Sequence, residues 1–152
     1  KDIEWISRMN QVSDLRCVFT EGSIALPADY REQTVNILIA PQKPSLNVSR
    51  DQLRPDESFE AYLARQREVL QKGLRKYQAL DEQLAVLGDS LFHGITLLYR
   101  YHPQKGQTLH QRQAAFLVSA STVLIFTLTS AHALSEQDEA FFSDCLNSYQ
   151  HP

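Results

Sequence analysis

The sequence has few of the residues that mark chemically specialised proteins. Its 152 residues include two cysteines, Cys17 and Cys145, with one methionine and one tryptophan. Two cysteines near opposite ends of a chain do not make a disulfide framework, so reduced thiols are expected. The net charge is −3, and the basic residues form no cluster. A nucleic-acid-binding surface needs clustered cations to neutralise phosphates, so this class is disfavoured.

Long apolar runs are absent as well. The longest runs, such as residues 123–126, fall far short of the ~20 residues that span a bilayer. No charged-then-apolar leader with a small-residue cleavage site is recognisable. The sequence therefore predicts a cytoplasmic protein that does not itself span a membrane. Hydrophobic residues make up 43% and charged residues 22%, as in an ordinary globular domain.

The first residues are interpreted separately. The chain begins at Lys1, and its only methionine is Met9. We interpret residues 1–8, which include Trp5, as a cloning remnant and residues 9–152 as a single domain.

Periodicity predicts strands followed by a helix, then more strands and a second helix. Alternation and turn residues predict strands over residues 16–20, 23–26, 34–40, 46–49, 79–87, 92–101, 108–118 and 122–129. Asp56 or Ser58 is expected to cap a helix whose apolar stripe runs from Phe59 to Tyr77. A capping box at residues 135–138 predicts a terminal helix to about Tyr149, with Phe141, Phe142 and Leu146 facing inward.

Short connections between successive strands favour antiparallel pairing. The predicted fold class is therefore α+β, an antiparallel sheet flanked by helices.

The search for catalytic chemistry finds no convincing set of residues. No histidine lies at metal-ligand spacing from another histidine or a cysteine, and no phosphate-binding glycine loop or nucleophile elbow is present. The histidines are His93, His102, His110, His132 and His151. We predict that the protein is not an enzyme and needs no cofactor or metal.

Three uncharged amides interrupt apolar patterns. Gln66 lies within the helix stripe, while Gln111 and Gln113 alternate with apolar residues along the strand at 108–118. In one interpretation these amides are partly exposed or hydrogen-bonded within the domain. In the other, they lie in an apolar groove and accept partners on a bound ligand.

Several segments of the sequence, two of which contain Gln66 and Gln113, resemble a known family. The runs FTEGSIALP at residues 19–27 and QTVNI at residues 33–37 resemble the opening of DcrB-like domains of the Mog1/PsbP type. Residues 49–51, 59–66 and 112–116 are similar to the Eag-type chaperones within that group. The resemblance extends over about residues 16–148 and implies a Mog1/PsbP-like fold.

The resemblance also implies a function. Eag-type chaperones act as cytosolic homodimers that bind and shield the N-terminal transmembrane helices of type VI secretion effectors with a PAAR domain, often of the Rhs type. Matching residues of this chain imply the partner-binding set Val35, Ile37, Asn47, Gln66, Leu70, Leu74, Leu109 and Gln113. Val35 and Ile37 would line an apolar groove, and Gln66 and Gln113 would hydrogen-bond the helices. Burial between subunits would also account for apolar residues on both faces of the strand at 122–129.

Two other functions stay open. A Mog1-like adaptor would bind a soluble protein through an exposed charged patch, and a hydrolase would need titratable groups that converge in one pocket. Similarity of fold does not decide between them.

Overall fold

The computed structural model describes residues 15–89 and 91–152 and contains two compact units, Lys1–Thr34 and Val35–Pro152. Residues 1–8, including Trp5, and Met9 lie outside the described residues. The interpretation of residues 9–152 as a single domain therefore stays a prediction.

The described part of the first unit is a hairpin. Strands β1 (Arg16–Phe19) and β2 (Gly22–Ala25) pair antiparallel, with Cys17 opposite Ile24. The Arg16 guanidinium donates hydrogen bonds to the hydroxyl and the carbonyl oxygen of Ser23, across the hairpin. Both strands lie where the alternation and the Glu21-Gly22 turn signal predict them.

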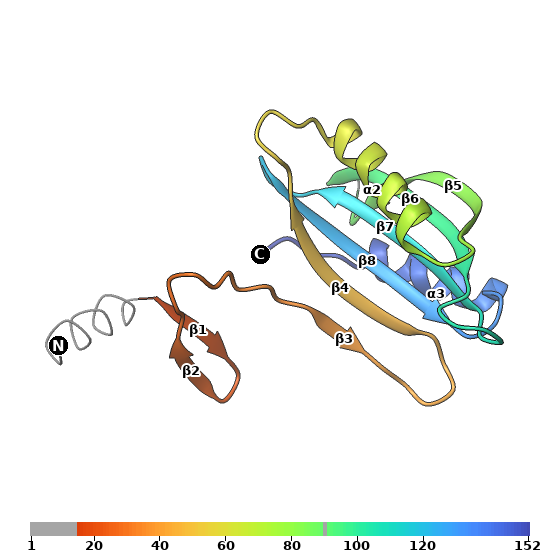
Figure 1. The fold of residues 1–152 in the computed structure, drawn as a ribbon, viewed down its shortest axis with the longest axis horizontal. Helices are drawn as coiled ribbons and strands as arrows, with labels where there is room; N and C mark the ends of the chain where they lie inside the picture. The colour runs from red at the N-terminus through yellow and green to blue at the C-terminus, as the bar shows by residue number, and fades with distance from the viewer. Residues whose placement is uncertain (1–14, 90) are drawn as a thin grey trace, which may run out of the picture. The chain divides into compact units, whose positions relative to one another are not determined.

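The second unit is a six-stranded antiparallel sheet with one helix on each face (Figure 1). The strand order is β3 (Asn36–Leu38), β4 (Ser45–Gln52), β8 (Thr122–Ser130), β7 (Leu109–Leu117), β6 (Phe92–Tyr101) and β5 (Gln78–Leu87). Helices α2 (Phe59–Gly73) and α3 (Glu136–Asn147) pack on opposite sides. The predicted α+β class is confirmed.

Both helices begin at the N-cap residues that the sequence predicts. The Ser58 hydroxyl accepts a hydrogen bond from the Ala61 N–H at the start of α2. Ser135 and Asp138 form a reciprocal capping box at the start of α3. Such caps satisfy N–H groups that have no partner within the helix.

Two helix predictions are wrong. The first helix, whose apolar stripe is expected to run to Tyr77, ends at Gly73, and Leu74 is its C-cap with an extended backbone. Phe142 and Leu146 of α3 are buried, but Phe141 is 47% exposed. At 100° per residue, Phe141 lies beside the stripe that Phe142 and Leu146 define, so it projects from the flank of the helix.

The core lies on both sides of the sheet. On the α2 side, Tyr62 and Leu63 pack with Ala115 and Val123. A second cluster, on the α3 side, consists of Leu46, Leu87, Ala114, Phe116, Leu128, Phe142 and Leu146. Both faces of β8 therefore pack against a helix within one chain, with Val123 in the cluster under α2 and Leu128 in the cluster under α3. Burial between subunits stays a prediction.

Arg112 connects the sheet to α3. Its side chain is 8% exposed and contacts Glu139 of α3 at 2.7 Å and Asp81 of β5 at 3.5 Å. Its guanidinium also donates a hydrogen bond to the Thr96 hydroxyl at 3.1 Å. One buried cation thus joins β5, β6, β7 and α3. Neither α2 nor α3 is long and apolar enough to cross a membrane, and this holds for all helices among residues 15–89 and 91–152.

Candidate partner-binding face

A single row of paired residues crosses the sheet and contains three of the predicted site residues. Ile37 is opposite Asn47, Asn47 is opposite Thr127, and Thr127 is opposite Gln113. Gln113 is in turn opposite Leu97. Directly paired residues of antiparallel strands share a face, so Ile37, Asn47 and Gln113 lie in line on one side of the sheet. We call Ile37, Asn47, Thr127, Gln113 and Leu97 the cross-strand row.

Helix α2 places Gln66 above the same row. Gln66, Gln113 and Leu97 line one small cavity of about 10 Å³ between the helix and the sheet. That volume is close to what one water molecule needs. The structure therefore places four of the eight predicted residues on or against this row: Ile37, Asn47, Gln66 and Gln113. Ile37 and Gln113 are three strand spacings apart, about 14 Å.

The amide nitrogens are already hydrogen-bonded within the domain. Gln66 Nε2 donates to Asp51 Oδ2 at 3.0 Å, and the Tyr62 hydroxyl donates to the same oxygen at 2.9 Å. Gln113 Nε2 donates to the Thr127 hydroxyl at 3.3 Å. Burial and the Asp51 carboxylate raise the pKa of Tyr62 above its ordinary value. The interpretation that these amides are hydrogen-bonded within the domain therefore holds for their nitrogen atoms. Their side-chain carbonyl oxygens accept no hydrogen bond from any described residue.

Asn47 contributes an unsatisfied acceptor. Its side chain is half-buried, and its Oδ1 is buried with no hydrogen-bond partner among the described residues. A buried polar atom left without a partner costs about 1–3 kcal/mol. Such an atom is typical of a site that a water molecule or a ligand completes.

The β3 end of the row is apolar and exposed. Ile37 is 61% exposed on β3, the edge strand of the sheet, and Val35, just before that strand, is 46% exposed. Their exposure leaves both side chains available for contact with a partner.

The remaining predicted residues lie off the row. Leu109 is on the same face of β7 as Gln113 but four residues along it, about 13 Å at ~3.3 Å per residue. Leu70 follows Gln66 by one turn of α2, and Leu74 is the C-cap just after the helix, with an extended backbone. All three are half-buried, and none belongs to the core clusters.

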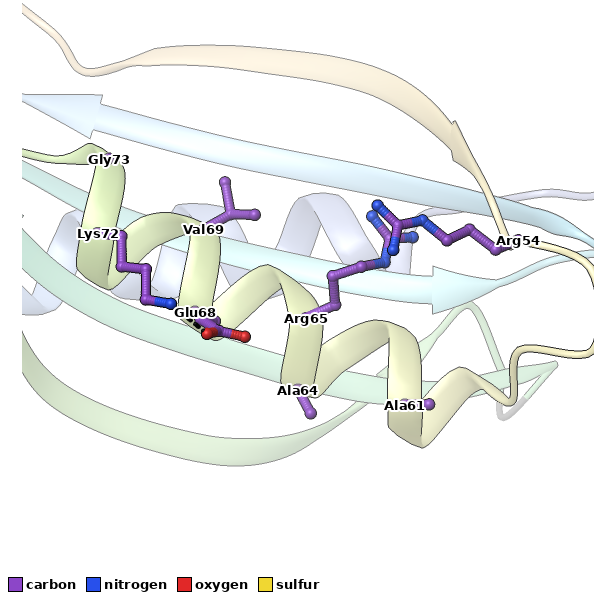
Figure 2. Close-up of a pocket in the computed structure, with 8 residues that line it drawn as sticks. All are labelled: Arg54, Ala61, Ala64, Arg65, Glu68, Val69, Lys72 and Gly73. Carbon is purple, nitrogen blue, oxygen red and sulfur yellow. Dashed lines mark hydrogen bonds and ion pairs between the residues drawn. The ribbon is translucent and has the colours of Figure 1, made fainter.

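The structure also contains a shallow hollow on the outer side of α2 (Figure 2). We call it the α2 hollow; its volume is about 780 Å³. It is lined by Arg54, Ala61, Ala64, Arg65, Glu68, Val69, Lys72 and Gly73. The sequence pattern predicts no site on this side of the helix. The small residues Ala61 and Ala64, one turn apart, are the signal that could have indicated the hollow.

An ion pair fixes one end of this hollow. Glu57 accepts hydrogen bonds from Arg65 Nη2 at 2.8 Å and Arg65 Nε at 2.9 Å. It also accepts one from the Arg54 backbone N–H at 3.1 Å. These bonds, those to Arg65 first, lower the pKa of Glu57 to about 2. The Arg65 guanidinium also lies 5.1 Å from the centre of the Tyr62 ring, so several contacts hold it in place.

The chemistry of this face is apolar contact and hydrogen bonding. Within residues 15–89 and 91–152, no group of three or more His, Cys, Asp or Glu side chains is placed to hold a metal ion. The cross-strand row combines an aliphatic end, amide and hydroxyl groups and an unpartnered carbonyl oxygen. This combination suits an apolar ligand that carries a few small polar groups.

Two solved structures are similar to this chain. Among solved structures, the chain is similar to PA94 of Pseudomonas aeruginosa, a protein of unknown function, with a TM-score of 0.66 and 22% identity. The match covers 91% of this chain and 96% of that one. It is also similar to the PsbP protein CyanoP of Synechocystis sp. PCC 6803, at 12% identity, with 83% of each chain covered and a TM-score of 0.49.

No curated protein sequence gives a significant match. A match to the DcrB family, however, runs from residue 21 to residue 148 and so includes β2, the whole sheet and both helices of the second unit. The chain therefore belongs to the DcrB family.

Proposed function

We propose that the protein is a chaperone that binds the N-terminal transmembrane helices of a PAAR-domain effector of the Rhs type and shields them before type VI export. It acts in the cytosol as a homodimer, by binding rather than catalysis. The partner-binding residues are those named from the resemblance, centred on Ile37, Asn47, Gln66 and Gln113.

The observation that carries the proposal is the cross-strand row. Three residues from separate parts of the sequence share one line on one face, and Gln66 lies against that line. Membership of the DcrB family does not identify the ligand, because a fold does not determine a function. The ligand is therefore inferred from this face.

The physical requirements of the ligand fit this face. A transmembrane helix in water exposes many apolar side chains, and each buried large side chain contributes about 1.5–3 kcal/mol. Exposed aliphatic groups such as Ile37 supply that burial. The amide carbonyl oxygens accept hydrogen bonds from Ser or Thr hydroxyls on the helix, and such contacts average about 0.6 kcal/mol between membrane helices. Weak polar contacts orient the ligand and still allow its release.

Co-expression of this protein with the apolar N-terminal segment of a PAAR-domain effector tests the proposal. The wild-type protein is expected to keep the segment in the soluble fraction, and Ile37→Lys is expected to reduce the retained amount at least ten-fold. The change removes the apolar burial of one large side chain, about 1.5–3 kcal/mol, and every 1.4 kcal/mol corresponds to a factor of ten.

Leu84→Lys is the matched control. Leu84 is 91% exposed on β5, the opposite edge strand, so this change adds the same charge away from Ile37. It is expected to leave retention unchanged, and both variants are expected to unfold at the wild-type urea midpoint. If Ile37→Lys unfolds the domain, Ile37 belongs to the core and the site is wrong. If the wild type retains a soluble partner domain but never the apolar segment, the Mog1-like adaptor role replaces this proposal.

A further inference from the structure

The two edges of the six-stranded sheet differ in how they are protected. An edge strand presents unpaired N–H and C=O groups, and proteins usually blunt such an edge with charged side chains, proline or a β-bulge. The β5 edge has this protection, because Asp81 and Glu82 lie on it and its register with β6 shifts between Ala79 and Asp81. The opposite edge strand, β3, has none of these devices within its three paired residues, Asn36–Leu38.

The segment around β3 is uncharged and exposed. Residues 33–42 include no Asp, Glu, Lys or Arg. Ile37, Leu38 and Ile39 are 61%, 55% and 81% exposed. Among the described residues β3 pairs with β4 alone, so no described strand covers its outer side (Figure 1). An exposed aliphatic edge of this kind is suited to pairing with another strand.

We infer that two copies of this protein pair antiparallel through β3, about a two-fold axis at Ile37, and so join their cross-strand rows into one surface. Such a pair brings no like charges together, because both partners contribute the same uncharged segment. Ile37, the middle residue of β3, then faces its own counterpart, and Val35 faces Ile39 of the second copy. Residues 35, 37 and 39 share one face of an extended strand, so these side chains meet on the face that carries the row.

The cross-strand row of one copy is shorter than its proposed ligand. From Ile37 to Leu97 it crosses four strand spacings, ~19 Å at ~4.8 Å each, and α2 lies over the end with Gln113 and Leu97. The apolar part of a membrane-spanning helix is ~30 Å long. Across the paired copies, the stretch from Thr127 through both Ile37 side chains to Thr127 of the second copy covers five spacings, ~24 Å. The binding surface is therefore incomplete without the second copy.

The pairing and the use of the joined surface have separate supports. The pairing stands on the contrast between the two edge strands. The use of the joined surface rests on the proposed function, which requires a homodimer without naming its interface.

Sedimentation velocity of the full chain tests the interface. The wild type is expected to dimerise, and Ile39→Lys is expected to raise the dissociation constant of the dimer at least about ten-fold, because the two-fold axis removes an aliphatic contact in both halves. Leu84→Lys makes the same change on β5, where Leu84 is 91% exposed, and is expected to leave the dissociation constant unchanged.

Cysteine cross-linking locates the pairing. In the Cys17→Ser, Cys145→Ser background, Ile37→Cys is expected to form an intermolecular disulfide on mild oxidation. Directly paired residues of antiparallel strands have Cα atoms ~4.5–5.5 Å apart, a separation that a disulfide can bridge. Leu84→Cys in the same background is the control; Leu84 is more exposed than Ile37, and this variant is expected to stay unlinked.

The outcomes separate this inference from the proposed function. A monomeric wild type that still keeps the apolar effector segment soluble would overturn the pairing and leave the shielding role standing. A monomer whose β3 amide protons resist exchange would show that another segment of the same chain covers the edge, and would also overturn the pairing. So would a dimer that Ile39→Lys leaves intact or that links through Leu84→Cys instead. A dimer that links through Ile37→Cys but retains no apolar segment would support the pairing and overturn the proposed function.

Discussion

At the residue scale, the glutamines show what a sequence pattern can and cannot reveal. Gln66 was recognisable because an amide interrupted an apolar stripe. Its hydrogen-bond acceptor, Asp51, was not recognisable. Asp51 lies on β4 and Gln66 on α2, and only the folding of the chain between them brings the two side chains within hydrogen-bond distance. The row that joins Ile37, Asn47 and Gln113 likewise depends on strand register, which no local pattern specifies in full.

Glu57 provides a prediction at the same scale. Its pKa falls from an ordinary 4.5 to about 2 in the folded protein, mainly because of Arg65. A carboxyl with a depressed folded pKa stabilises the protein above its unfolded pKa, and this contribution is lost as the pH falls. The wild type is therefore expected to be more stable than Glu57→Gln at pH 6, with a difference that shrinks from about pH 4.5 towards pH 2. Urea unfolding across this range measures it, and a difference independent of pH would contradict the assignment.

At the element scale, the sequence predicted the long strands better than the short ones. The strand at residues 92–101 was placed correctly because turn residues flank it closely. The strand expected over residues 34–40 is only Asn36–Leu38 in the structure. As an edge strand it pairs on one side alone, and its alternating aliphatic residues are exposed rather than buried. Alternation indicated a strand but not the length of its pairing.

The pairing of β6 with β7 leads to a second prediction. A Cβ at Gly94 would lie 1.9 Å from the carbonyl oxygen of Ala115 and 2.7 Å from the Phe116 ring. The backbone of β7 cannot move without disturbing the sheet, so Gly94→Ala is expected to lower the free energy of unfolding by at least about 2 kcal/mol.

Gly73→Ala is the matched control for this change. Nothing lies within 4 Å of a Cβ at this position, and alanine has the higher helix propensity. Urea denaturation is expected to show a neutral or slightly stabilising effect. Equal losses in the two variants would mean that the β6–β7 backbone contact is not what excludes a side chain at Gly94.

At the scale of the whole molecule, both core clusters belong to the second unit. Their buried members run from Leu46 to Leu146, so all of them follow Val35. The fragment Val35–Pro152 is therefore expected to fold on its own and to melt cooperatively within about 5 °C of the full chain. Circular dichroism melting curves of the two proteins test this. A fragment without a cooperative transition would show that the first 34 residues complete the core.

The position of β3 at the edge of the sheet has a consequence for the release step of the proposed chaperone role. Among the described residues only β4 pairs with this strand, so within one copy a helix bound against Ile37 would have the sheet on one side alone. Once the two copies separate, such a helix would leave past the open edge without separating any pair of strands within a copy and without exposing a core side chain to water.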